Sequence, residues 1–424
     1  MGARRVKITF LIHNVYGIGG TIRTTLNLAA ALADRHEVTI VSMLRQRARP
    51  RFAVDPRVRI VPLVDLREGS ADTADPLLGR PAEVFPAAEK RYRQYSRLTD
   101  RRAEEYLRAC DADVIIGTRP GVNVYLARFG PPGALRIAQE HLTHDTHSRK
   151  LLGSLARHYR ALDAVVTTTE ADAAVYRAKM RLPGVRVLAV PNGVPDPGLP
   201  PADLSAKVVA AAGRLVRGKR FDLLIEAFEE VAAKQPDWSL RIYGAGAEKE
   251  RLQQSIDGRG LAGQVRLMGT RSPIEPEFAQ ASIVVSASEA ESFGMTLVEA
   301  MRCGVPVVST DCPLGPAEII RHGVDGLLVP VGDREALTAA LLELITDEPA
   351  RRRMGEAARA AARRFDPAPV ARSYDDLFAE LAGSRRSRAW QRGLGSARGR
   401  LGSVRGRLGS VRGRLGRVLR GAGR

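Results

Sequence analysis

Residues 283–309 read IVVSASEAESFGMTLVEAMRCGVPVVS, and their pattern sets the fold class of the chain. An apolar run rich in β-branched residues comes first, which is typical of a buried strand. A polar turn follows, and the apolar residues after it recur with the spacing of a helix that Gly304 can end. A second β-rich run begins at residue 305. The stretch therefore predicts two strands of a parallel sheet that are joined by a helix.

The same alternation of β-rich runs and helical patterns extends along most of the chain, which predicts an α/β fold with parallel sheets. In the first half the β-rich runs are residues 6–12, 37–43, 58–63, 114–117, 135–139, 164–168 and 185–190. In the second half they are residues 208–212, 240–243, 265–268, 283–286, 305–309 and 327–329. Between the two sets lies PNGVPDPGLPP, residues 191–201, which is dense in residues that break regular structure.

This pattern predicts two doubly wound domains, at 1–195 and 196–369, then a helix at 370–382 and a tail at 383–424. Residues 66–100 are polar and interrupted by prolines, and a basic helical pattern begins near Pro86. We expect that segment to be an insertion or a mobile element rather than core. Doubly wound sheets bind ligands at the carboxyl ends of their strands, so the candidate residues are sought in the loops there.

The tail carries most of the formal net charge of +19, because residues 383–424 hold 13 arginines and no lysine or acidic residue. It repeats every seven residues from Leu394, with Leu and Ala or Val on one stripe of a helix. Two interpretations stay open: a segment that folds on an anionic membrane surface, or a disordered solubilising tail. Nucleic-acid binding is not expected, because the tail has no aromatic residue beyond Trp390 for bases to stack on.

Composition excludes several classes of protein. Hydrophobic residues make up 44% of the chain and charged residues 27%, which excludes wholesale disorder. No apolar run reaches the ~18 residues that a membrane span needs. The amino end lacks a small-residue cleavage site, and three cysteines are too few for a disulfide framework. We therefore expect a cytoplasmic protein, with peripheral attachment to the inner face of the cell membrane as an option for the tail.

The turn after residues 283–286 holds the strongest candidate site. The helix that starts near Gly294 would point free N–H groups into the crevice between the domains, and such donors suit a diphosphate. Glu291 and Glu299 lie eight residues apart, and a carboxylate can accept two hydrogen bonds from a vicinal diol. The structural alternative makes Glu291 an anion at the helix start and Glu299 a solvated residue. The residues that would supply the N–H groups are Phe293, Gly294, Met295 and Thr296.

Two further loops carry features that suit phosphate. Arg214 and Lys219 follow the run 208–212 and can reach a pyrophosphate, although an exposed basic loop is the plain alternative. Gly19 and Gly20 follow the run 6–12 and allow a ligand to approach the backbone closely. Their spacing fits neither a dinucleotide fingerprint nor a phosphate loop.

His141 follows the run 135–139 and is a candidate hydrogen-bond donor to a substrate. His144 and His147 continue a spacing of three, but in a helix the first and last rings would lie too far around the axis to share one metal ion. Capping or surface roles are expected for those two residues. No metal site is therefore expected.

Together these segments resemble the GT-B glycosyltransferases and, within them, the large retaining family 4. The resemblance covers nearly all of residues 4–380, and its most specific part is the pair Glu291 and Glu299 with Ser-Phe-Gly between them. It implies two Rossmann-like doubly wound domains facing a cleft, with residues 370–382 crossing back to the first. It also implies a retaining transfer from a nucleotide-diphosphate sugar, a UDP-sugar, without a metal cofactor. The acceptor implied is a cell-envelope polymer, a glycolipid or a lipid-linked saccharide.

The resemblance also implies roles for the candidate residues. Glu299 would hold the ribose, Glu291 the donor sugar hydroxyls, and His141 would contact the donor sugar from the first domain. The diphosphate would be bound by Arg214 and Lys219, the amides of Phe293 to Thr296, and the Gly19–Gly20 turn. A same-fold epimerase or phosphorylase, and a non-catalytic protein that binds anionic surfaces through its tail, are the alternatives.

Overall fold

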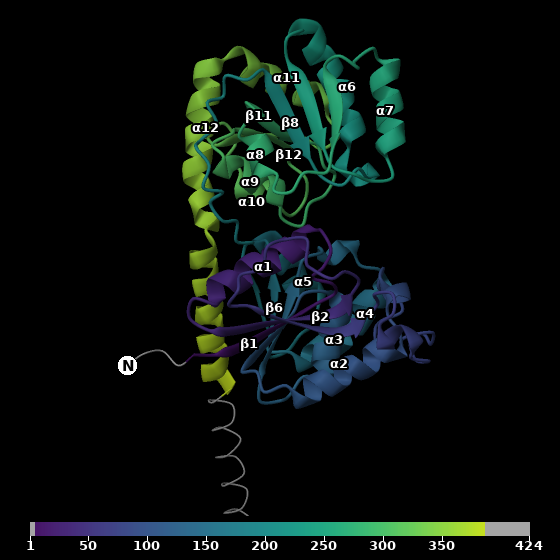
Figure 1. Cartoon of the computed structure of the whole chain (residues 1–424). Helices are drawn as coiled ribbons and strands as arrows, with labels where there is room; N and C mark the ends of the chain where they lie inside the picture. The colour runs from purple at the N-terminus through teal and green to yellow at the C-terminus, as the bar shows by residue number, and fades with distance from the viewer. Residues whose placement is uncertain (1–4, 386–424) are drawn as a thin grey trace, which may run out of the picture. The chain divides into compact units, whose positions relative to one another are not determined.

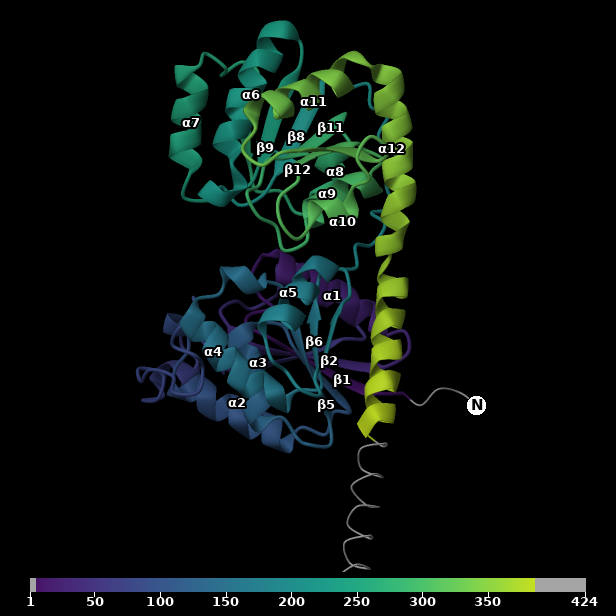
Figure 2. The ribbon, with the colours of Figure 1, turned by 180° about the vertical axis from the view of Figure 1, so that it is seen from behind.

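The computed structural model describes residues 5–385, and the predicted tail functions lie outside that range. Figures 1 and 2 show the ribbon from two opposite sides. The first half forms a parallel sheet in the order β3-β2-β1-β4-β5-β6-β7. Its strands are β1 (Lys7–Ile12), β2 (Glu37–Arg45), β3 (Arg59–Asp65), β4 (Val114–Gly117), β5 (Leu135–Glu140), β6 (Ala164–Thr167) and β7 (Arg186–Ala189). The order reverses between β1 and β4, which pair from Ile8 with Val114 onward.

The second half forms a parallel sheet in the order β10-β9-β8-β11-β12-β13. Its strands are β8 (Val208–Ala212), β9 (Ser239–Tyr243), β10 (Val265–Gly269), β11 (Ile283–Ser286), β12 (Val307–Thr310) and β13 (Gly326–Val329). Each β-rich run predicted from the sequence corresponds to one strand, so the expected pair of doubly wound α/β sheets is confirmed.

Helices cover the sheets (Figure 1). Those of the first half are α1 (Gly20–Leu32), α2 (Arg97–Ala109), α3 (Pro120–Phe129), α4 (Arg149–His158) and α5 (Glu170–Lys179). Those of the second half are α6 (Phe221–Lys234), α7 (Lys249–Gly258), α8 (Glu275–Phe278), α9 (Met295–Arg302), α10 (Pro316–Ile319), α11 (Arg334–Thr346) and α12 (Glu348–Ala362). Each sheet packs its branched aliphatic residues against these helices in buried cores of its own.

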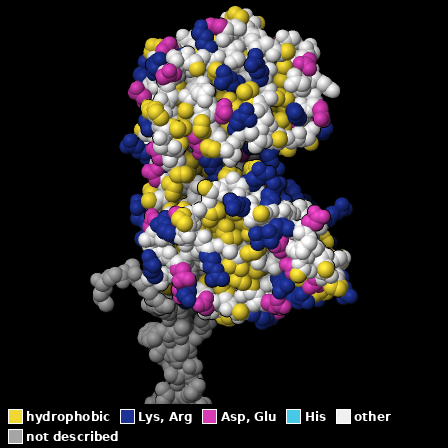
Figure 3. All heavy atoms as spheres, viewed as in Figure 1, with side chains coloured by type: hydrophobic (Ala, Val, Ile, Leu, Met, Phe, Trp, Pro, Cys, Tyr) yellow, Lys and Arg dark blue, Asp and Glu magenta, His cyan; other side chains and the backbone are white. Residues whose placement is uncertain are grey.

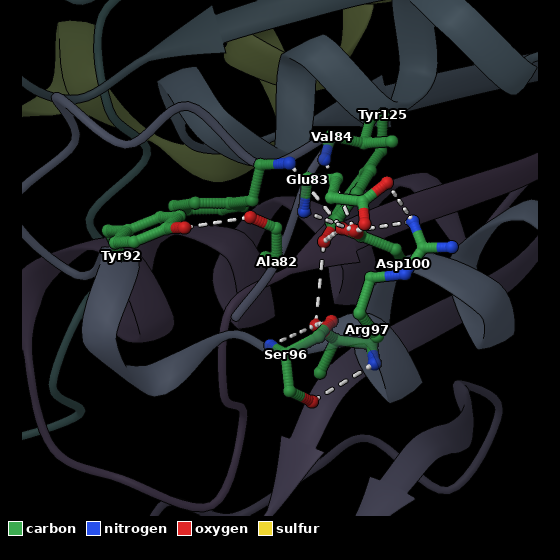
Figure 4. Close-up of polar contacts among 10 residues, drawn as sticks. Ala82, Glu83, Val84, Tyr92, Ser96, Arg97, Asp100 and Tyr125 are labelled. Atoms are coloured by element: carbon green, nitrogen blue, oxygen red, sulfur yellow. Dashed lines mark hydrogen bonds and ion pairs between the residues drawn. The ribbon is translucent and has the colours of Figure 1, made fainter. Parts of the chain in front are cut away.

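The segment at 66–100 contributes residues to the core, which its composition did not lead us to expect. Phe85 and Tyr95 are buried and stack with ring centroids 3.6 Å apart. Asp100 accepts hydrogen bonds from the backbone N–H groups of Glu83 and Val84, at 2.7 and 3.1 Å, and from the Tyr125 hydroxyl at 2.6 Å (Figure 4). One buried carboxylate therefore ties the loop to the core.

The helix predicted from Pro86 begins later, because α2 starts at Arg97 behind a Ser96 capping box. Between Pro86 and Ser96 the helical structure is a short 3-10 turn at Tyr92–Gln94.

The chain up to Ser373 is one compact unit, and a second begins at Tyr374. Residues 367–385 are helical, and in the second unit the rings of Tyr374 and Phe378 are 6.2 Å apart. Within the part of the chain that the structure describes, none of the helices has the length and apolar character that crossing a membrane requires.

Candidate functional site

Loops at the carboxyl ends of strands line a cavity of about 420 Å³. Its walls come from the turn before α1, the loops after β8, β9 and β10, and the start of α9. The predicted site residues among its lining are Gly19, Gly20, Arg214, Met295, Thr296 and Glu299. Sequence reasoning missed Phe52 and the stretch Thr270 to Ser272, which also line it.

The Arg214 loop is held by close backbone packing rather than by side chains. Gly213 N donates to Tyr243 O at 2.9 Å, and Leu215 N donates to Ala245 O at 3.0 Å. A Cβ atom at Gly244 would come within 1.8 Å of Gly213 O, so only glycine allows this approach. The Arg214 side chain is exposed at the cavity, and within residues 5–385 no hydrogen bond or ion pair engages it.

Lys219 and Glu291 form an ion pair with each other beside the cavity, outside its lining. The Ser288 hydroxyl also donates to Glu291 Oε1, at 2.8 Å. Gly315 packs against this turn, because a Cβ there would lie 2.4 Å from Phe293 O. Gly315 therefore shapes the turn that carries Glu291.

The start of α9 faces the cavity through Met295 and Thr296. Gly294 precedes the helix with a φ of 110°, a left-handed conformation that favours glycine. The side chain of Phe293 instead packs into the core, edge-on to Phe365 with centroids 5.5 Å apart. Only the backbone of Phe293 is therefore available to contact a ligand.

Glu299 is buried and faces a cation from the first half of the chain. Arg23 on α1 places Nη1 3.1 Å from Glu299 Oε1 and also pairs with Glu275 on α8. Burial raises the pKa of Glu299 to about 7, while Arg23 opposes that rise. Sequence reasoning missed Arg23, although its place in the first turn of a helix that follows a glycine turn was a usable signal.

His141 follows β5 but does not line the cavity. It is buried, and Nε2 finds no hydrogen-bond partner among the described residues. Burial lowers its pKa to about 4, so the ring is neutral near pH 7, and one ring nitrogen can donate a hydrogen bond while the other accepts one.

The expectation of a surface role for His144 was wrong. Its ring is buried edge-on against Tyr176, with centroids 5.2 Å apart, because the chain turns inward where Asp172 accepts a 3.0 Å hydrogen bond from His144 N. His147 Nε2 also lies inside, 3.9 Å from Glu140 Oε2. Across residues 5–385 no group of three or more His, Cys, Asp or Glu side chains is arranged to hold a metal ion.

Two family models match the chain in sequence. The one described as "Glycosyl transferases group 1" matches residues 200–361, and the one described as "Glycosyltransferase Family 4" matches residues 18–196. An exopolysaccharide phosphotransferase of Streptomyces coelicolor is 35% identical over 392 residues. That match covers 90% of this chain but 41% of the relative, so the chain spans about two fifths of that protein's length.

Solved structures share the fold. The Staphylococcus aureus protein TarM, in a complex with fondaparinux, alpha-GlcNAc-glycerol and UDP, aligns with a TM-score of 0.73 at 17% identity. The alignment covers 88% of this chain and 99% of TarM. The Anabaena protein HepE, in complex with UDP and glucose, aligns with a TM-score of 0.68 at 20% identity over 88% of this chain and 100% of HepE. The chain has two parallel sheets, matches a family model in each half and shares its fold with these structures. It therefore belongs to the GT-B glycosyltransferases of family 4, glycosyl transferases group 1.

Proposed function

We propose that the chain transfers a sugar from a nucleotide-diphosphate sugar, a UDP-sugar, to a hydroxyl of a cell-envelope polymer, a glycolipid or a lipid-linked saccharide. The observation that carries the proposal is the makeup of the cavity. A helix start, a glycine turn and the unpaired cation Arg214 all line it, together with the buried carboxylate of Glu299. Cations and free amides suit a diphosphate, and a carboxylate suits a vicinal diol.

In this proposal Glu299 binds the ribose and Arg214 binds the diphosphate, with the amides at the start of α9 beside it. Lys219 reaches the diphosphate from its ion pair with Glu291, whose second carboxylate oxygen is left to accept from a sugar hydroxyl. His141, neutral and with Nε2 unengaged among the described residues, is assigned the hydrogen bond to the donor sugar. No metal is assigned a role.

The proposed reaction is a same-face displacement that retains the anomeric configuration. The bond from the anomeric carbon to the diphosphate oxygen breaks, the acceptor oxygen bonds to that carbon, and the acceptor proton passes to the leaving phosphate. Negative charge grows on the diphosphate as the bond breaks. In this proposal Arg214, Lys219 and the α9 amides interact more strongly with that growing charge than with the intact donor, so they lower the barrier rather than merely holding the donor.

The acceptor class rests on the relatives. One is named for an exopolysaccharide, and the TarM structure contains alpha-GlcNAc-glycerol together with UDP. An acceptor at the cell envelope is also consistent with peripheral attachment of the protein to the inner face of the membrane. In this proposal residues 383–424 make that attachment.

The test is release of nucleoside diphosphate from a panel of UDP-sugars, with and without an envelope saccharide extract. A transferase releases UDP in step with acceptor, and the product keeps the anomeric configuration of the donor. An epimerase would convert the sugar without releasing UDP, and a phosphorylase would require inorganic phosphate. Either result would overturn the proposal.

A further inference from the structure

A second polar cluster lies on the first sheet at the point where its strand order reverses. It consists of His13, Glu89, Arg91 and Arg119, and is called here the switch-point cluster. His13 follows β1, and Arg119 precedes α3 after β4, so both side chains start from the carboxyl ends of adjacent strands. Open α/β sheets bind ligands at this point. None of the four residues lines the cavity proposed for the donor.

The cluster is built on a fixed frame. Asp100 ties the backbone of residues 83–85 to the core (Figure 4), and Phe85 stacks on Tyr95. The Tyr95 hydroxyl lies 2.8 Å from His13 Nδ1. The residues between these anchors, which include Glu89 and Arg91, are therefore held in place before any ligand arrives.

Positive charge in the cluster is not balanced. Arg119 pairs with the buried carboxylate of Glu89. Arg91 Nη1 instead contacts His13 Nε2 at 3.3 Å and Gln94 Oε1 at 3.2 Å, both uncharged partners. No carboxylate within residues 5–385 lies within ion-pair distance of Arg91. The Arg91 guanidinium thus has no direct ion pair, although the Arg91 backbone N–H donates to Glu89 Oε2 at 3.0 Å and the charge of Glu89 reaches it.

The neighbouring groups increase this imbalance. Burial and then the charge of Arg119 lower the pKa of Arg91, and Arg214 adds to this, whereas Tyr95 and the carboxylate of Glu89 oppose the shift. Burial, and then Arg91 and Arg119, lower the pKa of His13 to about 3, so the ring stays neutral and accepts from the guanidinium. Like charges gathered in a partly desolvated place are costly unless an anion joins them. Lys and Arg side chains are also concentrated toward the middle of the face drawn in Figure 3.

We propose that the switch-point cluster binds a phosphate group carried by the saccharide acceptor, with Arg91 as its main contact. This inference rests on the proposed transferase function and narrows its acceptor to an anionic one. The cationic cluster could in principle bind the diphosphate of the donor instead. The cavity proposed for the donor, however, has its own cation in Arg214, and none of the cluster residues lines it. The acceptor is the remaining substrate, and the cluster belongs to the sheet opposite the one that supplies Arg214.

The experiment is calorimetric titration of ribitol 5-phosphate into the full chain saturated with UDP, with ribitol as the neutral match. The unchanged chain is expected to bind the phosphate and not ribitol. Arg91→Gln is expected to weaken phosphate binding roughly tenfold or more, as the loss of a charge-assisted hydrogen bond does. Arg91→Lys keeps the charge and is expected to weaken it less. Arg93→Gln is the control, because it removes an exposed charge two residues away that contacts no other described side chain. It is expected to leave the affinity for the phosphate unchanged.

Three results would overturn the inference. The first is that Arg91→Gln leaves phosphate affinity unchanged, and the second is that Arg91→Gln and Arg93→Gln lower it equally. The third is that the unchanged chain does not bind the phosphate. A fourth is loss of UDP affinity on Arg91→Gln with phosphate binding retained, which would assign the cluster to the donor. All variants carry the same arginine-rich tail, so its contribution cancels. If UDP itself does not bind, the proposed function fails, and titration without UDP still tests the cluster.

Discussion

At the scale of single residues, Glu299 is the group whose chemistry depends most on its surroundings. Its carboxylate is buried, and burial holds its pKa at about 7. A carboxylate that accepts from a ribose diol must be ionised to offer both oxygens. The affinity for UDP should therefore fall as the pH drops through about 7, because the protonated form loses acceptor capacity.

Glu299→Gln removes that ionisation, so the difference in UDP affinity between the two proteins should be large above about pH 8 and small below about pH 6. Calorimetric titration of UDP at several pH values measures it. The titration of UDP's own phosphate is common to both proteins and cancels in the difference. A difference that does not change with pH would remove Glu299 from the ribose site.

Arg214 is expected to act on the reaction and not on the fold. It is exposed at the cavity, and within the described chain no partner engages its side chain. Arg214→Ala should lower kcat roughly a hundredfold, the usual scale for losing one preorganised charge. The free energy of unfolding should change by no more than about 0.5 kcal/mol.

The matched control is Arg217→Ala in the same loop, since the Arg217 side chain is 87% exposed and outside the cavity lining. It should leave both kcat and the thermal midpoint unchanged. If Arg214→Ala lowered activity only in proportion to stability, the residue would be structural.

At the scale of elements, the loops after β8 and β9 work as one unit because two glycines let their backbones touch. A Cβ at Gly244 would meet Gly213 O at 1.8 Å, and one at Gly246 would meet Leu215 O at 2.2 Å. Gly244→Ala must therefore displace the loop that carries Arg214. It should destabilise the fold by about 1–3 kcal/mol and also weaken UDP binding.

Gly218→Ala is the control, because a Cβ at Gly218 has no heavy atom within 4 Å and the residue lies in the same loop. Chemical denaturation and UDP titration measure the two effects. Unchanged UDP affinity in the Gly244→Ala chain would show that the packing of the two loops does not position the site.

The strands could be predicted from the sequence because each is a short, mostly apolar run between turns, and strands such as β4, β6 and β12 are buried along their whole length. The predicted and observed strands differ only in the residues at which they begin or end. β12, for example, starts at Val307 and not at residue 305, because Pro306 has no N–H for the sheet. The loops that carry Glu291, Arg214 and Gly19 could be predicted as site loops once the strands were known. Parallel strands bring their carboxyl ends, and the loops that follow them, to one edge of a sheet.

What the sequence could not show were contacts made by single polar residues far apart in the chain. Asp100 turns a polar, proline-rich segment into core by accepting backbone hydrogen bonds, and no periodicity marks such a residue. Arg23 was missed because its partners Glu275 and Glu299 lie more than 250 positions away. His144 was misplaced because a short polar spacing gives no sign of burial.

At the scale of the whole molecule, Arg23 links the first half of the chain to two buried carboxylates of the second. Arg23→Gln leaves Glu275 and Glu299 without that cation, which should cost about 3–5 kcal/mol of stability when both are ionised. Because the pKa of Glu299 is about 7, the cost should grow as the pH rises through that value and shrink below it. Urea unfolding at several pH values measures it, and a cost independent of pH would contradict this account.

The proposal as a whole requires that one cavity, drawn from both halves of the chain, receives the diphosphate of an activated sugar. A crystal structure of the full chain grown with UDP tests this most directly. The uracil nucleotide is expected in the cavity of about 420 Å³, with its ribose hydroxyls on Glu299 and its phosphates against Arg214 and the amides of Met295 and Thr296. UDP bound at another surface, with Glu299 still paired only to Arg23, would contradict it.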